Sequence, residues 1–69
     1  MASYIDPLLR QIAQLRRDNP VSDDVWAACD TAEAVLWRAK FGRGISPSTA
    51  YRAMAALDTA IKTIKADAA

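Results

Sequence analysis

The sequence predicts an all-α fold, and three observations support this prediction. Alanine, the strongest helix former, occurs fifteen times in 69 residues. β-Branched residues never alternate with polar residues over the length of a strand. Two breakers, Asn19-Pro20 and Gly42-Arg43-Gly44, divide the chain into three segments whose apolar residues recur at helical spacing. We therefore expect a single helical domain over residues 1–69.

The first helix is predicted over about residues 7–18. Asp6 can cap it, and Pro7 fits its first turn because a proline lacks the N–H that has no partner there. A narrow apolar stripe follows at Leu8, Leu9, Ile12 and Leu15. Pro20 prevents the helix from continuing. A helix of about twelve residues is marginal by itself, so this one must dock on another element.

The second helix is predicted over about residues 23–41. Ser22 can cap it, and Asp23-Asp24 favours the positive end of the helix dipole. One face is apolar over two heptads and consists of Val25, Ala28, Cys29, Ala32, Val35, Leu36 and Ala39. Gly42 or Gly44 can supply a left-handed cap at its end.

The third helix is predicted over about residues 47–66, with Ser46 as its cap and Pro47 in its first turn. A coiled-coil-like seam is formed by Ala50, Met54, Leu57, Ile61 and Ile64. Because the connection between the two long helices is short, we expect them to form a long antiparallel hairpin. The short N-terminal helix should dock on this hairpin.

This architecture leaves apolar surface uncovered. Trp26 and Trp37 are eleven residues apart, so they share a stripe beside the core face of the second helix. One hairpin partner cannot cover both faces, and we therefore predict a self-associating chain, a homo-oligomer. The expected subunit contact is either the stripe of Trp26 and Trp37 or the N-terminal helix with Leu8, Ile12 and Leu15. For the two tryptophans, packing under the N-terminal helix is the alternative.

Composition excludes several classes of activity. The chain has no histidine and a single cysteine, Cys29, which excludes histidine-based catalysis, an internal disulfide and a CxxC site. A free thiol indicates a reducing compartment, and no apolar run approaches the length of a spanning helix. We expect a cytoplasmic protein with no signal peptide and no membrane partner. No catalytic motif is present, so we predict a non-enzyme without a cofactor or a metal.

The net charge of +1 conceals a segregation of charge. Residues 21–37 contain four acidic and no basic residues, whereas residues 38–52 contain four basic and no acidic residues. The basic block coincides with the start of the third helix, where free N–H groups favour an anion. The predicted site for a phosphate-bearing ligand consists of Arg43, Arg52, Lys40, Ser48, Thr49 and Tyr51. Its arginines would bind phosphate, and Tyr51 or Trp37 would stack a base. Compensation of a helix dipole is the alternative explanation.

The stretch from Ile45 to Leu57 also looks like the opening of a recognition helix in helix-turn-helix or winged-helix regulators, where Ser, Thr, Tyr and Arg contact phosphates and base edges. That motif needs a short preceding helix, whereas the preceding helix here is long and acidic. A net charge near zero also argues against duplex binding. A helix-turn-helix-like DNA-binding protein is therefore the second alternative, and nucleic acid is not the expected partner.

Three stretches in the hairpin region show a resemblance to a known family. They are Val25-Trp26-Ala27-Ala28-Cys29, the restart at Ser46-Pro47-Ser48, and Ala53-Met54-Ala55-Ala56-Leu57-Asp58-Thr59-Ala60-Ile61. Their order resembles that of the small phage helical-hairpin sponge proteins that counter CBASS and Thoeris signalling. The resemblance implies a phage protein, acting in the host cytoplasm, and a non-enzymatic oligomer whose intersubunit pockets sequester cyclic nucleotide signals. The N-terminal helix between prolines and the two tryptophans depart from that family.

The predicted function is therefore that of a small counter-defence protein that sequesters a cyclic nucleotide signal as an oligomer. Phage proteins of similar size that inhibit a host regulator by direct binding, such as quorum-sensing anti-activators, also look like short helical hairpins. The alternative is accordingly a small helical inhibitor that binds and blocks a host protein.

Overall fold

The prediction of an all-helical chain is confirmed by the computed structural model, which describes residues 4–42 and 45–68. Three helices follow one another in the sequence: α1 (Ile5–Asp18), α2 (Asp23–Lys40) and α3 (Pro47–Ala68). Neither described range contains a strand. The molecule is elongated and measures 40 × 19 × 14 Å.

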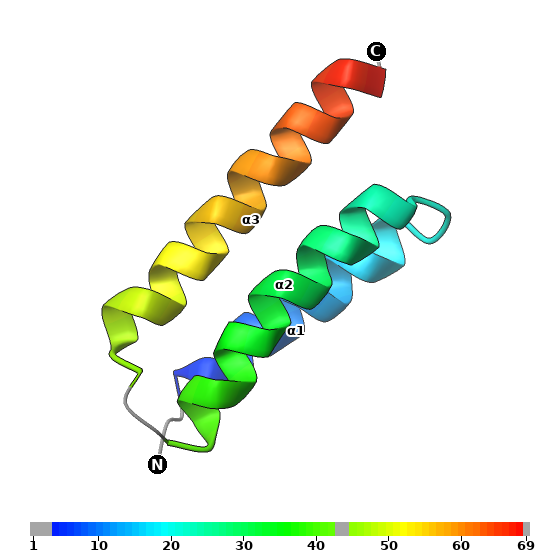
Figure 1. Ribbon diagram of the computed structural model, residues 1–69. Helices are drawn as coiled ribbons and strands as arrows, with labels where there is room; N and C mark the ends of the chain where they lie inside the picture. Colours follow the sequence, from blue (N-terminus) through cyan, green and yellow to red (C-terminus); the bar gives the residue numbers. More distant parts are fainter. Residues whose placement is uncertain (1–3, 43–44, 69) are drawn as a thin grey trace.

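The central element is α2, because both other helices pack on it. Most contacts between elements join α1 to α2 and α2 to α3, whereas α1 and α3 contact each other little. Figure 1 shows α2 running towards the end of the molecule where the N-terminus lies, while α1 and α3 run the opposite way. Each helix therefore packs mainly on its neighbour in the sequence.

The start of α1 differs from the sequence prediction. The helix begins at Ile5, and Asp6 lies in its first turn; the cap residue is Tyr4, whose side chain makes no capping hydrogen bond. Pro7 is accommodated because the first N–H groups of a helix have no helical partner. Ile5 is fully buried, so the two extra residues at the start of the helix add a side chain to the core. Burial of that side chain outweighs the missing cap.

The ends of α2 follow from its capping residues. The Ser22 hydroxyl accepts a hydrogen bond from the N–H of Val25 at 3.4 Å, as the capping prediction required. At the other end, Gly42 has a φ of +81°, and its N–H donates to the carbonyl of Arg38 at 3.0 Å. This is a left-handed helix cap, which glycine adopts without a steric penalty. Gly44, the other candidate, lies outside the described residues.

The start of α3 is capped by Ser46. The N–H of Thr49 donates to the Ser46 carbonyl at 3.0 Å and approaches its hydroxyl at 3.4 Å. Ile45, just before the cap, is half-buried against the core. The chain therefore enters α3 along the core rather than away from it.

The core lies where the apolar faces of all three helices meet on α2. Its buried residues are Ile5, Leu8, Ile12, Val25, Cys29, Ala32, Leu36, Ala39, Ala50, Leu57 and Ile61. Leu8 and Ile12, which we predicted at a subunit contact, are among them, because α1 docks on α2 and covers them within one chain. That part of the interface prediction is corrected: the two residues are core residues. Leu15 lies partly buried at the edge of the core.

Candidate functional site

One guanidinium ties α1 to α2. Arg16, in the last turn of α1, donates to Glu33 at 2.8 Å and also pairs with Asp30. Its guanidinium lies over the ring of Trp26, 5.3 Å from the ring centroid, and only 17% of the side chain is exposed. The hydrogen bond with Asp30, reinforced by the charge of Glu33, raises the pKa of Arg16 above its ordinary value. The sequence analysis did not single out this residue.

Trp26 is held in place from two directions. Its indole N–H donates to the carbonyl of Asn19 at 3.0 Å, in the turn between α1 and α2, and Arg16 covers one face of the ring. The side chain nevertheless remains 43% exposed. Trp26 is therefore a fixed aromatic group at the surface, since its N–H is satisfied and one ring edge faces solvent.

A second aromatic group lies at the opposite end of α2. The rings of Trp37 and Phe41 stack at 5.6 Å between centroids and 9° between planes. Lys40 lies 5.2 Å from the Trp37 centroid, and its ammonium also pairs with Asp6 of α1 at 2.9 Å. Trp37 is 40% exposed and Phe41 is 70% exposed. This stack is a preformed apolar surface that stays open to solvent.

Together, Trp26, Trp37 and Phe41 form what we call the aromatic stripe of α2. The two tryptophans project from one face of the helix about 16 Å apart, because eleven residues rise by that distance. The sequence analysis named both tryptophans but missed Phe41. A signal was present, because Phe41 follows Trp37 by four residues and so lies beside it at the helix end.

Of the residues predicted to bind a phosphate, Ser48, Thr49, Tyr51 and Arg52 lie in the first two turns of α3, whereas Lys40 lies at the end of α2. Lys40 is engaged by Asp6, and Tyr51 lies beside Tyr4, with 5.8 Å between their ring centroids. Ser48 and Thr49 lie in the first turn of α3, and Arg52 is exposed in the next turn. Arg43 lies outside the described residues.

The hydroxyl groups at the start of α3 interact mainly with each other. The Ser46 oxygen lies 2.9 Å from that of Ser48 and 3.2 Å from that of Thr49. All three side chains are exposed, and the first turn of α3 contains no acidic residue. An anion is electrostatically acceptable at this position, but the hydroxyls already have partners within the cap.

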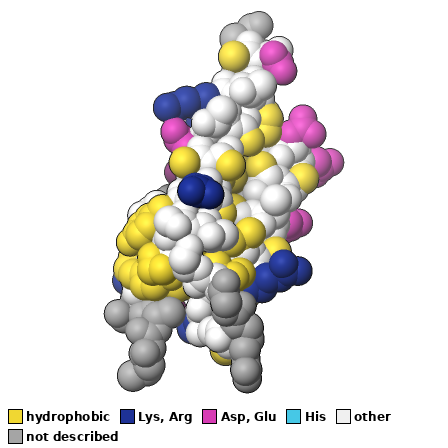
Figure 2. Space-filling view, turned by 60° about the vertical axis from the view of Figure 1, so that its left-hand side comes forward, with side chains coloured by type: hydrophobic (Ala, Val, Ile, Leu, Met, Phe, Trp, Pro, Cys, Tyr) yellow, Lys and Arg dark blue, Asp and Glu magenta, His cyan; other side chains and the backbone are white. Residues whose placement is uncertain are grey.

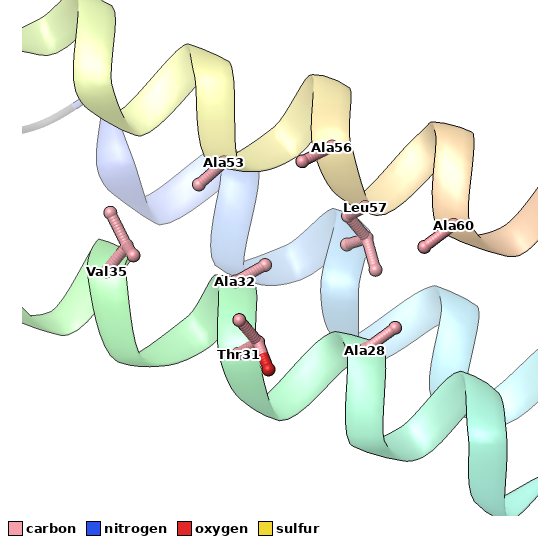
Figure 3. A pocket seen from close by; sticks show the side chains of 8 residues that line it. All are labelled: Ala28, Thr31, Ala32, Val35, Ala53, Ala56, Leu57 and Ala60. Atoms are coloured by element: carbon pink, nitrogen blue, oxygen red, sulfur yellow. The ribbon is translucent and has the colours of Figure 1, made fainter.

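Two grooves flank α3. The first, of about 330 Å³, runs between α2 and α3 and is lined by Ala28, Thr31, Ala32, Val35, Ala53, Ala56, Leu57 and Ala60. Figure 3 shows the Leu57 side chain between the two ribbons, with alanines on either side of it. This groove offers methyl groups and a single hydroxyl, so it lacks the charged or polar groups that orient a small ligand.

The second groove, of about 620 Å³, lies between α1 and α3. Its apolar lining includes Leu15, Met54 and Ile61, and its rim carries Asp58 and Lys65. Figure 2, in which α3 has come towards the viewer, shows hydrophobic side chains reaching the surface between charged ones, most densely near the grey segments at the bottom. An apolar floor with a charged rim is the usual composition of a protein interface.

Comparison with known proteins gives no family. No protein-family model matches the chain, and neither curated proteins nor solved structures include a significant match. The function must therefore be inferred from the surfaces described above.

The described residues include one cysteine, Cys29, which is buried. They contain no cluster of three metal-ligating side chains, and no helix among them is long and apolar enough to cross a membrane. Burial raises the pKa of the Cys29 thiol, although Arg16 acts in the opposite direction. A buried thiol that resists ionisation is a poor nucleophile. The described surface offers exposed aromatic side chains and an open groove with an apolar lining, which are features of binding surfaces.

Proposed function

We propose that this chain is a non-enzymatic interaction protein that self-associates as an antiparallel hairpin and binds a protein partner through the aromatic stripe. The observation that supports this proposal is the Trp37–Phe41 stack, which is open to solvent and held beside α1 by the contacts of Lys40. Tryptophan and other aromatic anchors supply much of the binding energy at interfaces. A rigid anchor also loses little conformational entropy on binding.

The structure favours a protein rather than a small molecule as the ligand of this surface. The stripe is a convex helix face, whereas small-molecule sites are concave and enclose most of the ligand. Two anchors about 16 Å apart match the span of three turns of a partner helix or of a short extended segment. Binding there would cover a surface of the partner and so block it, in the manner of a small inhibitor.

Site-specific photo-crosslinking tests this proposal. A photoreactive phenylalanine analogue in place of Phe41 should give a dominant adduct with one protein of the cell in which the chain acts. The same analogue in place of Thr63, which is exposed on α3, is the matched control and should not give that adduct. The Trp37→Ala variant should lose most of the adduct while keeping its helical circular dichroism. Equal adducts from both positions, or none from Phe41, would contradict the proposal.

A second candidate function is the binding of a phosphate-bearing ligand, such as a cyclic nucleotide, at the start of α3. One observation favours it: Arg52 is exposed one turn beyond Ser48 and forms no ion pair within residues 4–42 and 45–68. Calorimetry with a panel of cyclic di- and trinucleotides tests it. We expect heat of binding that disappears in the Arg52→Ala and Arg43→Ala variants. Absence of heat with every nucleotide would reject this function and leave the first one standing.

A further inference from the structure

The side of α3 that faces α1 is open, although apolar residues reach it. Met54 and Ile61 line the α1–α3 groove from α3, and Leu15 lines it from α1. The two helices contact each other little, so the groove is not closed by the chain itself. The aromatic stripe lies on the other side of α1, as the bonds from α2 to Arg16 and Asp6 show. A partner in the groove would therefore leave the stripe accessible.

The rim of the groove carries opposite charges at a regular spacing. Asp58 and Lys65 are seven residues apart and therefore lie on the same side of α3, about 10 Å from each other. Lys62 lines the groove as well, and it pairs with Asp58 within the helix at 3.0 Å. An acid and a base two turns apart on one helix face are self-complementary: when two such helices run antiparallel, each acid faces the other helix's base.

We propose that the α1–α3 groove holds α3 of a second copy of this chain. The two α3 helices would run antiparallel about a two-fold axis that passes between Ile61 and Lys62. In this arrangement Asp58 of each copy faces Lys65 of the partner subunit, and Ile61 lies at the centre of the contact. The inference rests on the self-association proposed above and deepens it by naming the face and the register.

The size of the molecule is compatible with such a contact. A standard interface buries about 800 Å² per partner, which is roughly one sixth of the 4784 Å² surface of this chain. The paired part of α3, from Met54 onwards, is about 20 Å long. Its apolar centre and charged rim follow the usual order of an isologous interface. The dimer would present two aromatic stripes, one from each copy.

Charge reversal across the proposed axis tests the inference. In the Lys65→Asp variant, two pairs of acids face each other, and we expect the dimer dissociation constant to rise about tenfold. The Asp58→Lys variant should show a similar rise. The double variant Asp58→Lys/Lys65→Asp restores both opposite-charge pairs, and its dissociation constant should return to within about threefold of the wild-type value. Sedimentation equilibrium measures all four.

The Thr59→Lys variant is the matched control, because Thr59 lies next to Asp58 but is not part of the groove. We expect it to leave the dissociation constant unchanged, and circular dichroism should show equal helix content in every variant. A wild-type chain that stays monomeric would overturn both this inference and the proposed self-association. If the chain is an oligomer but none of the three charge variants changes its dissociation constant, the groove assignment alone is overturned. Self-association would then use another face.

Discussion

α1 and α3 both pack on α2, but side chains fasten them to it in different ways. α1 is bonded near both of its ends, by Asp6 to Lys40 at one and by Arg16 to Asp30 and Glu33 at the other. Between α3 and the other two helices, the described residues form no side-chain hydrogen bond and no ion pair. α3 is held by apolar packing on α2, with Ala50, Leu57 and Ile61 in the core, and by the contact of Tyr51 with Tyr4.

Because of this difference, we expect α1 to be held more rigidly on α2 than α3 is. An ion pair or hydrogen bond is satisfied in one geometry, so the bonds of α1 fix its position along α2. Apolar packing fixes the position of a helix less strictly, because it is non-directional. We therefore expect α1 and α2 to form the rigid unit that displays the aromatic stripe. α3 should be the element that adjusts when a partner occupies the α1–α3 groove.

The largest loss of stability is expected from a substitution on the face of α2 against which both other helices pack. Leu36 is fully buried at the centre of the apolar face of α2. The Leu36→Ala variant should lose about 2–5 kcal/mol of the free energy of unfolding, which is enough to unfold most of a chain this small. Urea titration followed by circular dichroism measures this loss. The control is Val35→Ala, at a half-buried position that lines the α2–α3 groove, and its loss should be clearly smaller.

A smaller loss of stability is expected from removing the side-chain contacts by which Arg16 holds α1 on α2. Arg16→Met keeps most of the side-chain volume but removes three contacts, and we expect a loss of about 1–2 kcal/mol. Amide hydrogen exchange should become faster in α1 than in α3. Arg17→Met is the control, because Arg17 is exposed and should contribute within about 0.5 kcal/mol. Equal effects of the two variants would show that α1 is held by apolar packing, as α3 is.

The next effect concerns pH and reports on the α1–α2 contact, where Cys29 is buried near Arg16. Burial raises the pKa of this thiol, so the folded chain keeps the proton at a pH where the unfolded chain releases it. The resulting stability is complete below the unfolded thiol's pKa of about 8.5 and is lost as the pH rises above it. Relative to Cys29→Ala, the wild type should therefore lose free energy of unfolding between pH 8 and pH 9.5. Parallel pH profiles of the two proteins would contradict this expectation.

The smallest loss of stability is expected at the second ion pair between α1 and α2. The Lys40–Asp6 pair is partly exposed, and exposed pairs contribute between zero and about 1 kcal/mol. We expect Lys40→Met to cost about 0.5 kcal/mol at low ionic strength, and the cost should vanish in 1 M salt. Thermal unfolding at two salt concentrations measures it. A cost that persists in high salt would locate the contribution of Lys40 in its contact with Trp37 rather than in the ion pair.

Much of the fold could be predicted from local signals. The helix caps at Ser22, Ser46 and Gly42 are found at positions that the sequence predicts, because a cap depends on a few consecutive residues. The start of α1 could not be predicted in this way, since Pro7 is tolerated in a first turn and the decisive residue, Ile5, is buried by tertiary packing in the core. Boundaries set by tertiary burial are not encoded in local sequence.

The candidate site was less predictable. Helical spacing shows which residues share a face but not whether the same chain or another covers it, and for this reason Leu8 and Ile12 were assigned to a subunit contact. The basic residues near the turn are close in sequence, yet Lys40 pairs with Asp6 of α1 and Arg52 lies exposed on α3. Arg16 escaped notice because its partners are fourteen and seventeen residues away, a separation that no local pattern reports.

The order of packing, in which each helix lies against its neighbour in the sequence, also has a consequence for the rate of folding. Most contacts between elements join helices that are consecutive in the sequence, so few of them need the closure of a long loop, and the entropic barrier to the native arrangement is low. Helical proteins dominated by such local contacts fold in microseconds to milliseconds. The aromatic stripe and its side-chain contacts with α1 lie within residues 5–41, so they can form while α3 is still undocked. A chain that leaves the ribosome from its N-terminus can thus present its proposed binding surface before it is complete.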